Sequence, residues 1–379
     1  MDVTDWSRIV KQSLIGLEPY RPGASLDELK EAYGLDEIVK LNWNEGLDGP
    51  FPGVEEEVVA ELERAWIYPA EAYSDLRDGV AGWLGTSPER IVPSHGIQAL
   101  IATVAHAFLD PGDSVVLTAP TYGLYATTCA AAGAQVVEVP SRDLRHDVDA
   151  LAAAAREANA RLVWLCDPNN PTGSLVTRDE WERLLGGLPE RCAVIVDEAY
   201  TEYVDPAVRV DRLADVDAGA PIVLMRTFSK IFGLAGLRLG YAVVAEPLAE
   251  LLDVVQEPFN VNRAALAAGR ASLRRVELVE ERRLSNAEGR GRLAEGLRAG
   301  GATPCPSQAN FLLADVGVDD LTLTEALARR GFLVRAGSEF GLVGFVRITT
   351  GPIALMERVA AELAEARARL AGPLGSVAP

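Results

Sequence analysis

Two spacings of hydrophobic residues alternate along most of the chain. Helical spacing at 52–66, 71–84 and 96–109 predicts three helices, with a short strand at 90–94 between the last two. The strands predicted further along are continuous apolar runs separated by helical stretches, namely SVVLTAP, AQVVEVP, RLVWLC, AVIVDEAY and PIVLMRT. Buried strands that alternate with helices are typical of a parallel sheet covered on both faces. The pattern therefore predicts an α/β fold whose mostly parallel sheet lies between helices.

The hydrophobic pattern changes near residue 262. A long, charged helical tract extends to about residue 300, and short apolar runs and a final helix follow it. This order of elements predicts a smaller α+β domain at the C-terminal end. We therefore expect an N-terminal arm at 1–35 and a large domain at 36–260. The small domain is expected at 261–379, beginning with the long linking helix.

Composition and charge exclude several classes of protein. The formal net charge of −19 at pH 7 argues against nucleic acid as a partner, because phosphate backbones require a basic surface. The four cysteines have no spacing typical of a metal site, so we expect free thiols and no metal. The polar start of the chain does not resemble a signal peptide, and no apolar run is long enough to span a membrane. We expect a cytoplasmic protein that binds small molecules.

Polar side chains follow the predicted strands at the point where each strand ends. Ligands of such a sheet bind outside the carboxyl ends of its strands, so these side chains are expected to lie together. One at a time, residues of this kind are commonly helix caps, turn residues or solvated charges. Their convergence on one edge nevertheless predicts a site. The set comprises His95, Gly96, Ile97, Gln98, Tyr122, Asn170, Asp197, Tyr200, Thr227, Ser229 and Lys230.

The chemistry that unites this set is that of pyridoxal 5'-phosphate. Lys230 carries an amine that can bond to the cofactor's aldehyde, and Asp197 can keep the pyridine nitrogen protonated. Asn170 and Tyr200 can donate to the phenolic oxygen, while Tyr122 can stack on the ring. Backbone N–H groups at a helix N-terminus, hydroxyls and a guanidinium can hold the phosphate. These phosphate ligands are expected to be Gly96, Ile97, Gln98, Thr227, Ser229 and Arg238.

With these residues in place, the chain resembles the fold-type I pyridoxal-phosphate aminotransferases of class I and II. The similarity extends from EPYRPG at 18–23 to VRITTG at 346–351, and it is most specific in DPNNPTG, VDEAY and RTFSKIFGLAGLRLGY. Within this family the chain is most similar to the histidinol-phosphate aminotransferases. The resemblance implies transamination between histidinol phosphate and 2-oxoglutarate in histidine biosynthesis. It implies that Lys230, Asp197 and Tyr200 are catalytic, with the freed Lys230 amine as the base.

The resemblance also implies a homodimer with shared active sites. Tyr68, in WIYPAEAY, is expected to reach the cofactor phosphate of the other subunit. Arginines of the small domain are expected to hold the anionic group of the substrate. The substrate-binding residues implied in this way are Tyr20, Asn44, His95, Asn170, Arg335 and Arg347.

Two side chains depart from the family's usual pattern, and alternative functions stay open. In SHGIQA at 94–99, His95 replaces the usual asparagine and Gln98 replaces an acid. One alternative is an aromatic or other amino-acid aminotransferase, in which Arg347 alone holds a carboxylate. Another is a decarboxylase that acts on an amino-acid phosphate with the same scaffold. A ligand-sensing module of a transcription regulator is disfavoured, because the chain is acidic and no basic DNA-binding domain precedes the arm.

Overall fold

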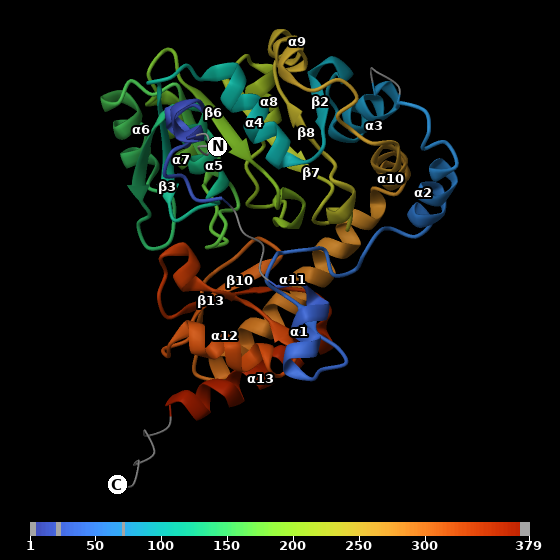
Figure 1. Cartoon of the computed structure of the whole chain (residues 1–379), viewed down its shortest axis with the longest axis vertical. Helices are drawn as coiled ribbons and strands as arrows, with labels where there is room; N and C mark the ends of the chain where they lie inside the picture. The colour runs from blue at the N-terminus through green and yellow to red at the C-terminus, as the bar shows by residue number, and fades with distance from the viewer. Residues whose placement is uncertain (1–4, 20–23, 70–72, 372–379) are drawn as a thin grey trace.

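The computed structural model describes residues 5–19, 24–69 and 73–371, which form two parts (Figure 1). The larger part is an α/β unit, and the smaller part is an α+β unit at the C-terminal end. Helix α11 (Glu277–Ala299) runs from the larger part into the smaller one. The predicted α/β class with a smaller α+β unit is confirmed.

The larger part is built around a sheet of seven strands in the order β2-β8-β7-β6-β5-β3-β4. Every pairing from β7 to β4 is parallel, whereas β8 runs antiparallel to both of its neighbours. The carboxyl ends of β2, β5, β6 and β7 therefore share one edge with the start of β8. The strands are β2 (Ile91–Ser94), β3 (Ser114–Ala119), β4 (Gln135–Pro140), β5 (Leu162–Cys166), β6 (Ala193–Asp197), β7 (Ile222–Thr227) and β8 (Gly240–Val243).

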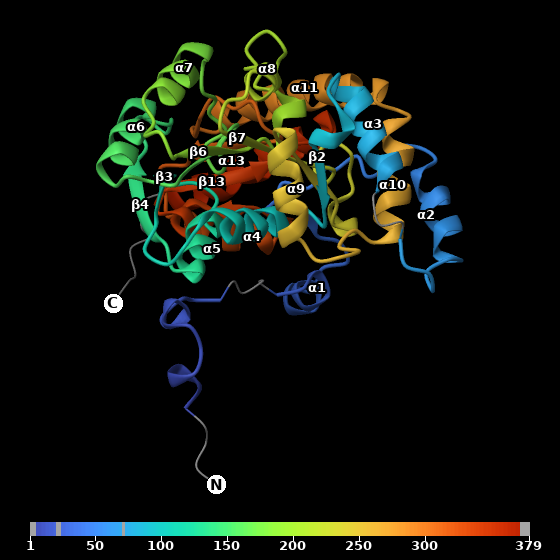
Figure 2. The same cartoon turned by 90° about the horizontal axis from the view of Figure 1, so that it is seen from above.

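Helices cover both faces of this sheet, which explains why its central strands are apolar throughout. Figure 2 shows α4 and α5 on one side of the sheet and α7 and α8 on the other. Every residue of β5 and β6 is buried. The helices of this part are α2 (Val54–Leu62), α3 (Ser74–Leu84), α4 (Ile97–Phe108), α5 (Leu124–Ala132), α6 (Val148–Glu157), α7 (Arg178–Gly186), α8 (Leu213–Asp217), α9 (Glu246–Val255) and α10 (Arg263–Leu273).

The smaller part consists of an antiparallel sheet in the order β12-β13-β10-β9, against which α11 and α13 pack. A separate parallel pair joins β1 to β11, so the segment after α1 contributes to this part. The elements are α1 (Leu26–Tyr33), β1 (Val39–Lys40), β9 (Thr303–Pro304), β10 (Phe311–Asp315), α12 (Asp320–Ala328), β11 (Phe332–Leu333), β12 (Arg335–Ala336), β13 (Phe345–Thr349) and α13 (Ile353–Ala371).

The chain is divided between two hydrophobic cores, and this division differs from the one that the sequence pattern predicts. Helix α10 belongs to the core of the large sheet, where Ala265, Ala268 and Ala271 are buried. Leu41, which precedes that sheet, belongs instead to the core of the smaller part. The helical tract predicted as one element is two helices, α10 and α11. Helix α10 packs in the core of the large sheet, whereas α11 begins against that core with Leu278 and Val279 and continues into the core of the smaller part with Leu293 and Leu297. The domain limits of 1–35, 36–260 and 261–379 stay a prediction.

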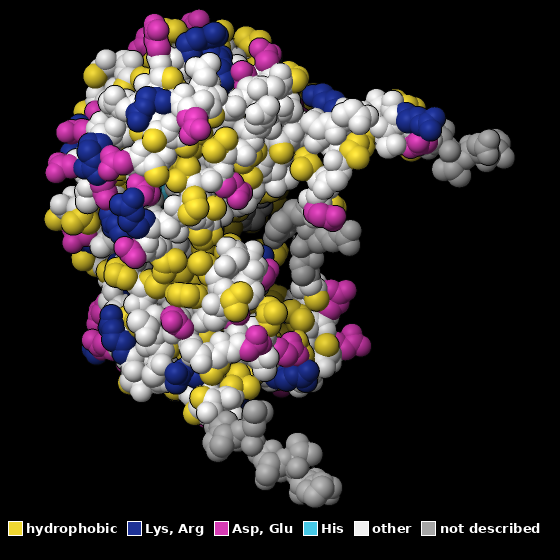
Figure 3. Space-filling view, turned by 90° about the vertical axis from the view of Figure 1, so that its left-hand side faces the viewer, with side chains coloured by type: hydrophobic (Ala, Val, Ile, Leu, Met, Phe, Trp, Pro, Cys, Tyr) yellow, Lys and Arg dark blue, Asp and Glu magenta, His cyan; other side chains and the backbone are white. Residues whose placement is uncertain are grey.

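No helix in the described ranges has both the length and the apolar character that a membrane crossing requires. The arm at 5–19 reaches out from the body of the molecule (Figures 2 and 3). It carries two short 3-10 helices, and the Ser13 hydroxyl anchors it by donating to the Ala131 carbonyl of α5 at 2.9 Å. Trp6, Ile9 and Ile15 on this arm are exposed.

Candidate active site

The edge where the parallel strands end brings together most of the predicted site residues. The turn 167–173 after β5 presents Asn170, β6 ends at Asp197, and the loop after β7 carries Lys230. Asn170 and Asp197 are buried, whereas Lys230 is half-buried. Gly173 closes the turn with a φ of +75°, and a Cβ there would lie 2.3 Å from the Ser307 hydroxyl. The turn therefore packs closely on the smaller part of the molecule.

Lys230 contacts a segment from the beginning of the chain. Its Nζ donates to the Trp43 carbonyl at 3.1 Å, and it lies 5.6 Å from the centre of the Tyr200 ring. A Cβ at Gly46 would lie 2.1 Å from the Lys230 carbonyl oxygen, so only glycine permits this approach. Burial, followed by the positive charge of Arg347, lowers the pKa of Lys230 to about 8. A substantial fraction of this amine is therefore neutral near physiological pH.

Asp197 is a buried carboxylate held at the end of β6. Its Oδ2 accepts a hydrogen bond from the Tyr125 hydroxyl at 2.5 Å, and its Oδ1 accepts one from the Ala199 N–H at 3.0 Å. The Tyr125 ring stacks on Trp164 of β5, with ring centres 4.8 Å apart. Burial raises the pKa of Asp197 to about 6 despite these two donors. The side chain is thus an anion above that pH, and a protonated nitrogen beside it would offset its burial.

Asn44, Asn170, Tyr200 and Arg347 form a polar wall next to Lys230. The Asn44 amide donates to the Tyr200 hydroxyl at 3.1 Å, and Arg347 donates to the Asn170 side-chain oxygen. Arg347 also donates to the Asn42 carbonyl at 2.6 Å. Burial raises the pKa of Tyr200, so its hydroxyl stays protonated and can donate. The wall combines donors from both parts of the molecule.

The N-terminus of α4 offers the features expected of a phosphate site. Among the described residues, no protein group accepts a hydrogen bond from the backbone N–H groups of Ile97 and Gln98. The Gly96 N–H donates to the Ser94 carbonyl at 2.8 Å, and its contact with a phosphate stays a prediction. Arg238 approaches closely, because a Cβ at Gly96 would lie 3.0 Å from its guanidinium. An anion here meets backbone donors and a cation together.

Gln98 links this phosphate site to the expected ring-stacking residue. Its Nε2 donates to the Tyr122 hydroxyl at 3.0 Å, and its Oε1 accepts from Arg238 at 3.2 Å. Because the Gln98 side chain is neutral, it orients Arg238 without cancelling the guanidinium charge. Thr227 lies opposite Gly240 in the sheet, and its hydroxyl accepts the N–H of Ser229 at 3.0 Å. Thr227 and Ser229 therefore lie next to the start of β8, just before which Arg238 is located.

Four further predicted residues are exposed, lie next to this cluster or fall outside the described residues. Tyr68 is exposed and stacks on Phe259, with ring centres 4.8 Å apart. His95 is exposed at the end of β2. Arg335 is directly opposite Arg347 in the β12–β13 pairing, and it forms an ion pair of 2.7 Å with Glu339. Tyr20 lies outside the described residues, so its predicted contact stays a prediction.

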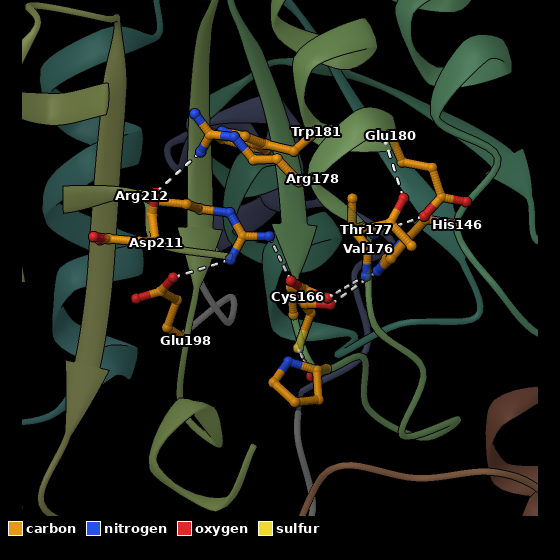
Figure 4. Close-up of polar contacts among 12 residues, drawn as sticks. His146, Cys166, Val176, Thr177, Arg178, Glu180, Trp181, Glu198, Asp211 and Arg212 are labelled. Carbon is orange, nitrogen blue, oxygen red and sulfur yellow. Dashed lines mark hydrogen bonds and ion pairs between the residues drawn. The ribbon is translucent and has the colours of Figure 1, made fainter. Parts of the chain in front are cut away.

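A buried ion cluster that the sequence pattern did not indicate lies behind the site (Figure 4). Arg212 donates to Asp167 at the end of β5 and to Glu198 at the end of β6, the latter at 3.0 Å. Arg226 donates to the other Glu198 oxygen at 2.8 Å, and the Trp181 ring lies 4.7 Å from the Arg212 guanidinium. Arg212 therefore ties together the two strands that present Asn170 and Asp197.

His146 is a neutral side chain that contacts the end of β5. Its Nε2 lies 2.8 Å from the Cys166 carbonyl, which can only accept, so this nitrogen carries the proton. Its Nδ1 then accepts from the Thr118 hydroxyl at 2.7 Å. Burial lowers the pKa of His146, in agreement with the neutral form.

Replacing Arg212 with methionine is expected to reduce the free energy of unfolding by about 3–5 kcal/mol, because it leaves the buried Asp167 without the cation that it binds and Glu198 with Arg226 alone. Urea denaturation of the purified protein measures this change. Arg191→Met, at an exposed arginine, is the matched control and should change the free energy by less than about 0.5 kcal/mol. Equal effects of the two substitutions would show that the cluster does not stabilise the strand ends.

The residues that this edge gathers fit pyridoxal phosphate. Asp197 is a buried acid and Lys230 is a half-buried base. Burial is the main cause of the pKa shift of each. The free N–H groups at α4 lie beside Arg238, at the other end of the cluster. A ring nitrogen, an aldehyde and a phosphate thus each have a complementary partner.

Comparison with known proteins places this geometry in a family. The model of "Aminotransferase class I and II" matches residues 36–363. Histidinol-phosphate aminotransferases of Brevibacillus brevis and Geobacillus thermodenitrificans are 36% and 37% identical, over 90% and 92% of this chain and 93% and 96% of theirs. The crystal structure of histidinol-phosphate aminotransferase from Sinorhizobium meliloti with pyridoxal 5'-phosphate matches with a TM-score of 0.86. It is 30% identical, over 93% of this chain and 96% of that one, which confirms the predicted aminotransferase fold. The chain belongs to the class I and II aminotransferase family.

Proposed function

We propose that this protein is a pyridoxal-phosphate-dependent aminotransferase that moves the amino group of histidinol phosphate to 2-oxoglutarate, a step of histidine biosynthesis. The observation that carries the proposal is the position of Lys230 at the sheet edge that also presents the buried Asp197, next to the polar wall that contains Arg347. Asp197 suits the cofactor ring, and Arg347 suits an anionic substrate. The two curated relatives described above carry the corresponding name.

In this proposal the cofactor is held at its two ends. Asp197 pairs with the pyridine nitrogen, and Asn170 and Tyr200 contact the phenolic oxygen. Tyr122 would cover the ring face, and the Lys230 amine would hold the cofactor through its aldehyde. When bound, the ring accepts the electron pair that remains on the donor carbon after its proton is removed. The phosphate ligands are Gly96, Ile97, Gln98, Thr227, Ser229 and Arg238 of this subunit and Tyr68 of a second copy.

Lys230 then acts as the base that moves a proton. Its pKa of about 8 is below that of an ordinary lysine, so removing the Cα proton does not require strongly alkaline pH. Below pH 8 most of the amine is protonated, and the protonated amine has no lone pair with which to accept the Cα proton. The Tyr200 ring close to Nζ and the Trp43 carbonyl keep the amine near the reacting carbon.

The anionic group of each substrate is held on the smaller part of the molecule. Arg347 is buried and already oriented by Asn170 and Asn42. Arg335 lies opposite it in the sheet, so a phosphate dianion can meet two guanidinium groups. Tyr20, Asn44 and His95 complete the proposed substrate contacts.

A panel of amino donors tests the proposed function directly. Holoenzyme is incubated with 2-oxoglutarate and either histidinol phosphate, an aromatic amino acid or an amino-acid phosphate. We expect glutamate to form fastest with histidinol phosphate. Faster reaction with the aromatic donor would establish the aromatic aminotransferase instead. Release of carbon dioxide without glutamate would establish a decarboxylase.

Arg335→Ala is expected to raise the KM for histidinol phosphate about tenfold to hundredfold, because a charge-assisted bond to the phosphate is lost. The KM for 2-oxoglutarate should change little, since Arg347 still holds its carboxylate. Steady-state kinetics with each substrate measures both values. Arg329→Ala, directly after α12, serves as control, because Arg329 is exposed and pairs with Glu325 of that helix. A silent Arg335→Ala substitution would favour the aromatic substrate.

A homodimer with shared sites is part of the proposal. Tyr68 and Trp66 are 77% and 84% exposed, and Val59 and Leu62 on α2 are exposed beside them. Together with the projecting apolar arm, this surface suits a second copy of the chain. A cytoplasmic location is proposed on the basis of the four cysteines, which are all free thiols.

A further inference from the structure

Two arginines face each other across the small sheet. Arg335 of β12 and Arg347 of β13 are directly paired, although like charges in this position repel. Both guanidinium groups lie near the Phe340 ring, at 5.9 Å and 5.1 Å from its centre. The side chains therefore converge on one place beside the polar wall of the site. Such a pair of cations has a clear use when an anion with two negative charges binds between them.

Glu339 neutralises one of these two cations. It follows β12 in the 3-10 helix Gly337–Phe340, and its Oε2 lies 2.7 Å from Arg335. Arg335 and Glu339 expose 25% and 43% of their side chains, so water reaches both. Arg347, by contrast, is buried and contacts uncharged oxygens of Asn170 and Asn42. Arg335 is therefore the cation of this pair whose carboxylate partner can be exchanged for a ligand.

We infer that Glu339 determines specificity by competing with the phosphate group for Arg335. When the bound anion is a carboxylate, Arg347 matches its single charge and Glu339 stays on Arg335. When a phosphate dianion binds, it takes both guanidinium groups and Glu339 moves into solvent. One anion site can then serve the phosphorylated donor in one half-reaction and the keto acid in the other. The inference rests on the proposed function, because it takes the donor to be a phosphate ester.

The energetic scale of the ion pair permits this exchange. A partly exposed pair of this kind changes an equilibrium by about two- to fivefold. A dianion that gains a second guanidinium gains more than this, so it can displace the carboxylate. A monoanion already held by Arg347 gains less from doing so. Glu339 therefore weakens every ligand that needs Arg335 and leaves the others nearly unaffected.

The test is the substitution Glu339→Gln, which keeps the size of the side chain and removes its charge. Holoenzyme saturated with cofactor is titrated calorimetrically with inorganic phosphate and with acetate, so that the cofactor's own phosphate site is filled. We expect the affinity for phosphate relative to acetate to rise about two- to fivefold. The KM for histidinol phosphate should fall by a similar factor, while the KM for 2-oxoglutarate changes less than about twofold.

Two controls identify the origin of the change. Glu182→Gln removes a partner of Arg178 that has the same sequence spacing and a distance of 2.9 Å but lies on α7. Glu182→Gln should alter neither the affinity for phosphate relative to acetate nor the two KM values. In an Arg335→Ala background, Glu339→Gln should lose its effect, because the competition needs the guanidinium group.

An unchanged or weaker phosphate affinity in Glu339→Gln would overturn the inference, since Glu339 would then merely hold Arg335 in place. The outcome is separable from that of the proposed function. If histidinol phosphate is not a substrate of the wild-type protein but the phosphate-to-acetate ratio rises, the substrate proposal fails and Glu339 still competes with dianions. If histidinol phosphate reacts and the ratio does not move, the function stands and the role of Glu339 is refuted.

Discussion

Replacing Lys230 with alanine is expected to lower the rate of transamination by about four orders of magnitude. The substitution removes both the amine that bonds to the aldehyde and the base that moves the proton. We expect no other lysine to replace it, because the remaining lysines are Lys11 on the arm, Lys30 on α1 and Lys40, which pairs with Glu45. Single-turnover measurement of the keto product gives the rate. The visible absorption of the holoenzyme should also become insensitive to borohydride.

Rescue by a small amine separates chemistry from folding in this variant. Added methylamine should restore part of the lost rate, because it can occupy the space of the missing Nζ and accept the proton. Lys30→Ala, a change on α1, is the control and should keep the full rate. Near-normal turnover of Lys230→Ala without added amine would refute the assignment of the active site.

The residues at the strand ends could be predicted because hydrophobic runs locate strand ends. Asn170, Asp197 and Lys230 each follow such a run, and a parallel sheet brings its carboxyl ends together. The motif around Lys230 supplied the rest through its resemblance to a family. The fold was therefore predictable from the local pattern, and the cofactor from the local pattern together with the resemblance.

Partners that are distant in sequence were not predictable in this way. Arg212 lies 45 residues from Asp167, and Tyr125 lies 72 residues from Asp197. Neither pairing leaves a periodic signal, because each depends on how loops meet behind the sheet. The charged residues next to buried strand ends, such as Glu198, were the only available hint that a compensating cation was needed. The ion pair of Arg335 with Glu339 is likewise not predicted by its i,i+4 spacing alone.

Asp197 illustrates why a functional group can be costly to the fold. Burial raises its pKa from the ordinary value to about 6, so in the protein without cofactor its ionisation opposes folding. Because the pKa of this acid is higher in the folded protein than in the unfolded chain, the free energy of unfolding decreases as pH rises from the unfolded pKa through 6. A neutral side chain of the same shape at this position should therefore fold at least as well at pH 7–8.

Asp197→Asn is accordingly expected to lower the transamination rate at least about a hundredfold while leaving the thermal midpoint of the cofactor-free protein unchanged or higher. The amide oxygen can still accept from the Ala199 N–H, and the amide NH2 can donate to the Tyr125 hydroxyl oxygen. A neutral amide cannot stabilise a protonated ring nitrogen, so the electron pair left by proton removal has no acceptor. Single-turnover rates and thermal unfolding at pH 7.5 measure the two effects, with the exposed Asp179→Asn as control. A rate loss under about twofold would reduce Asp197 to a residue that merely orders the end of β6.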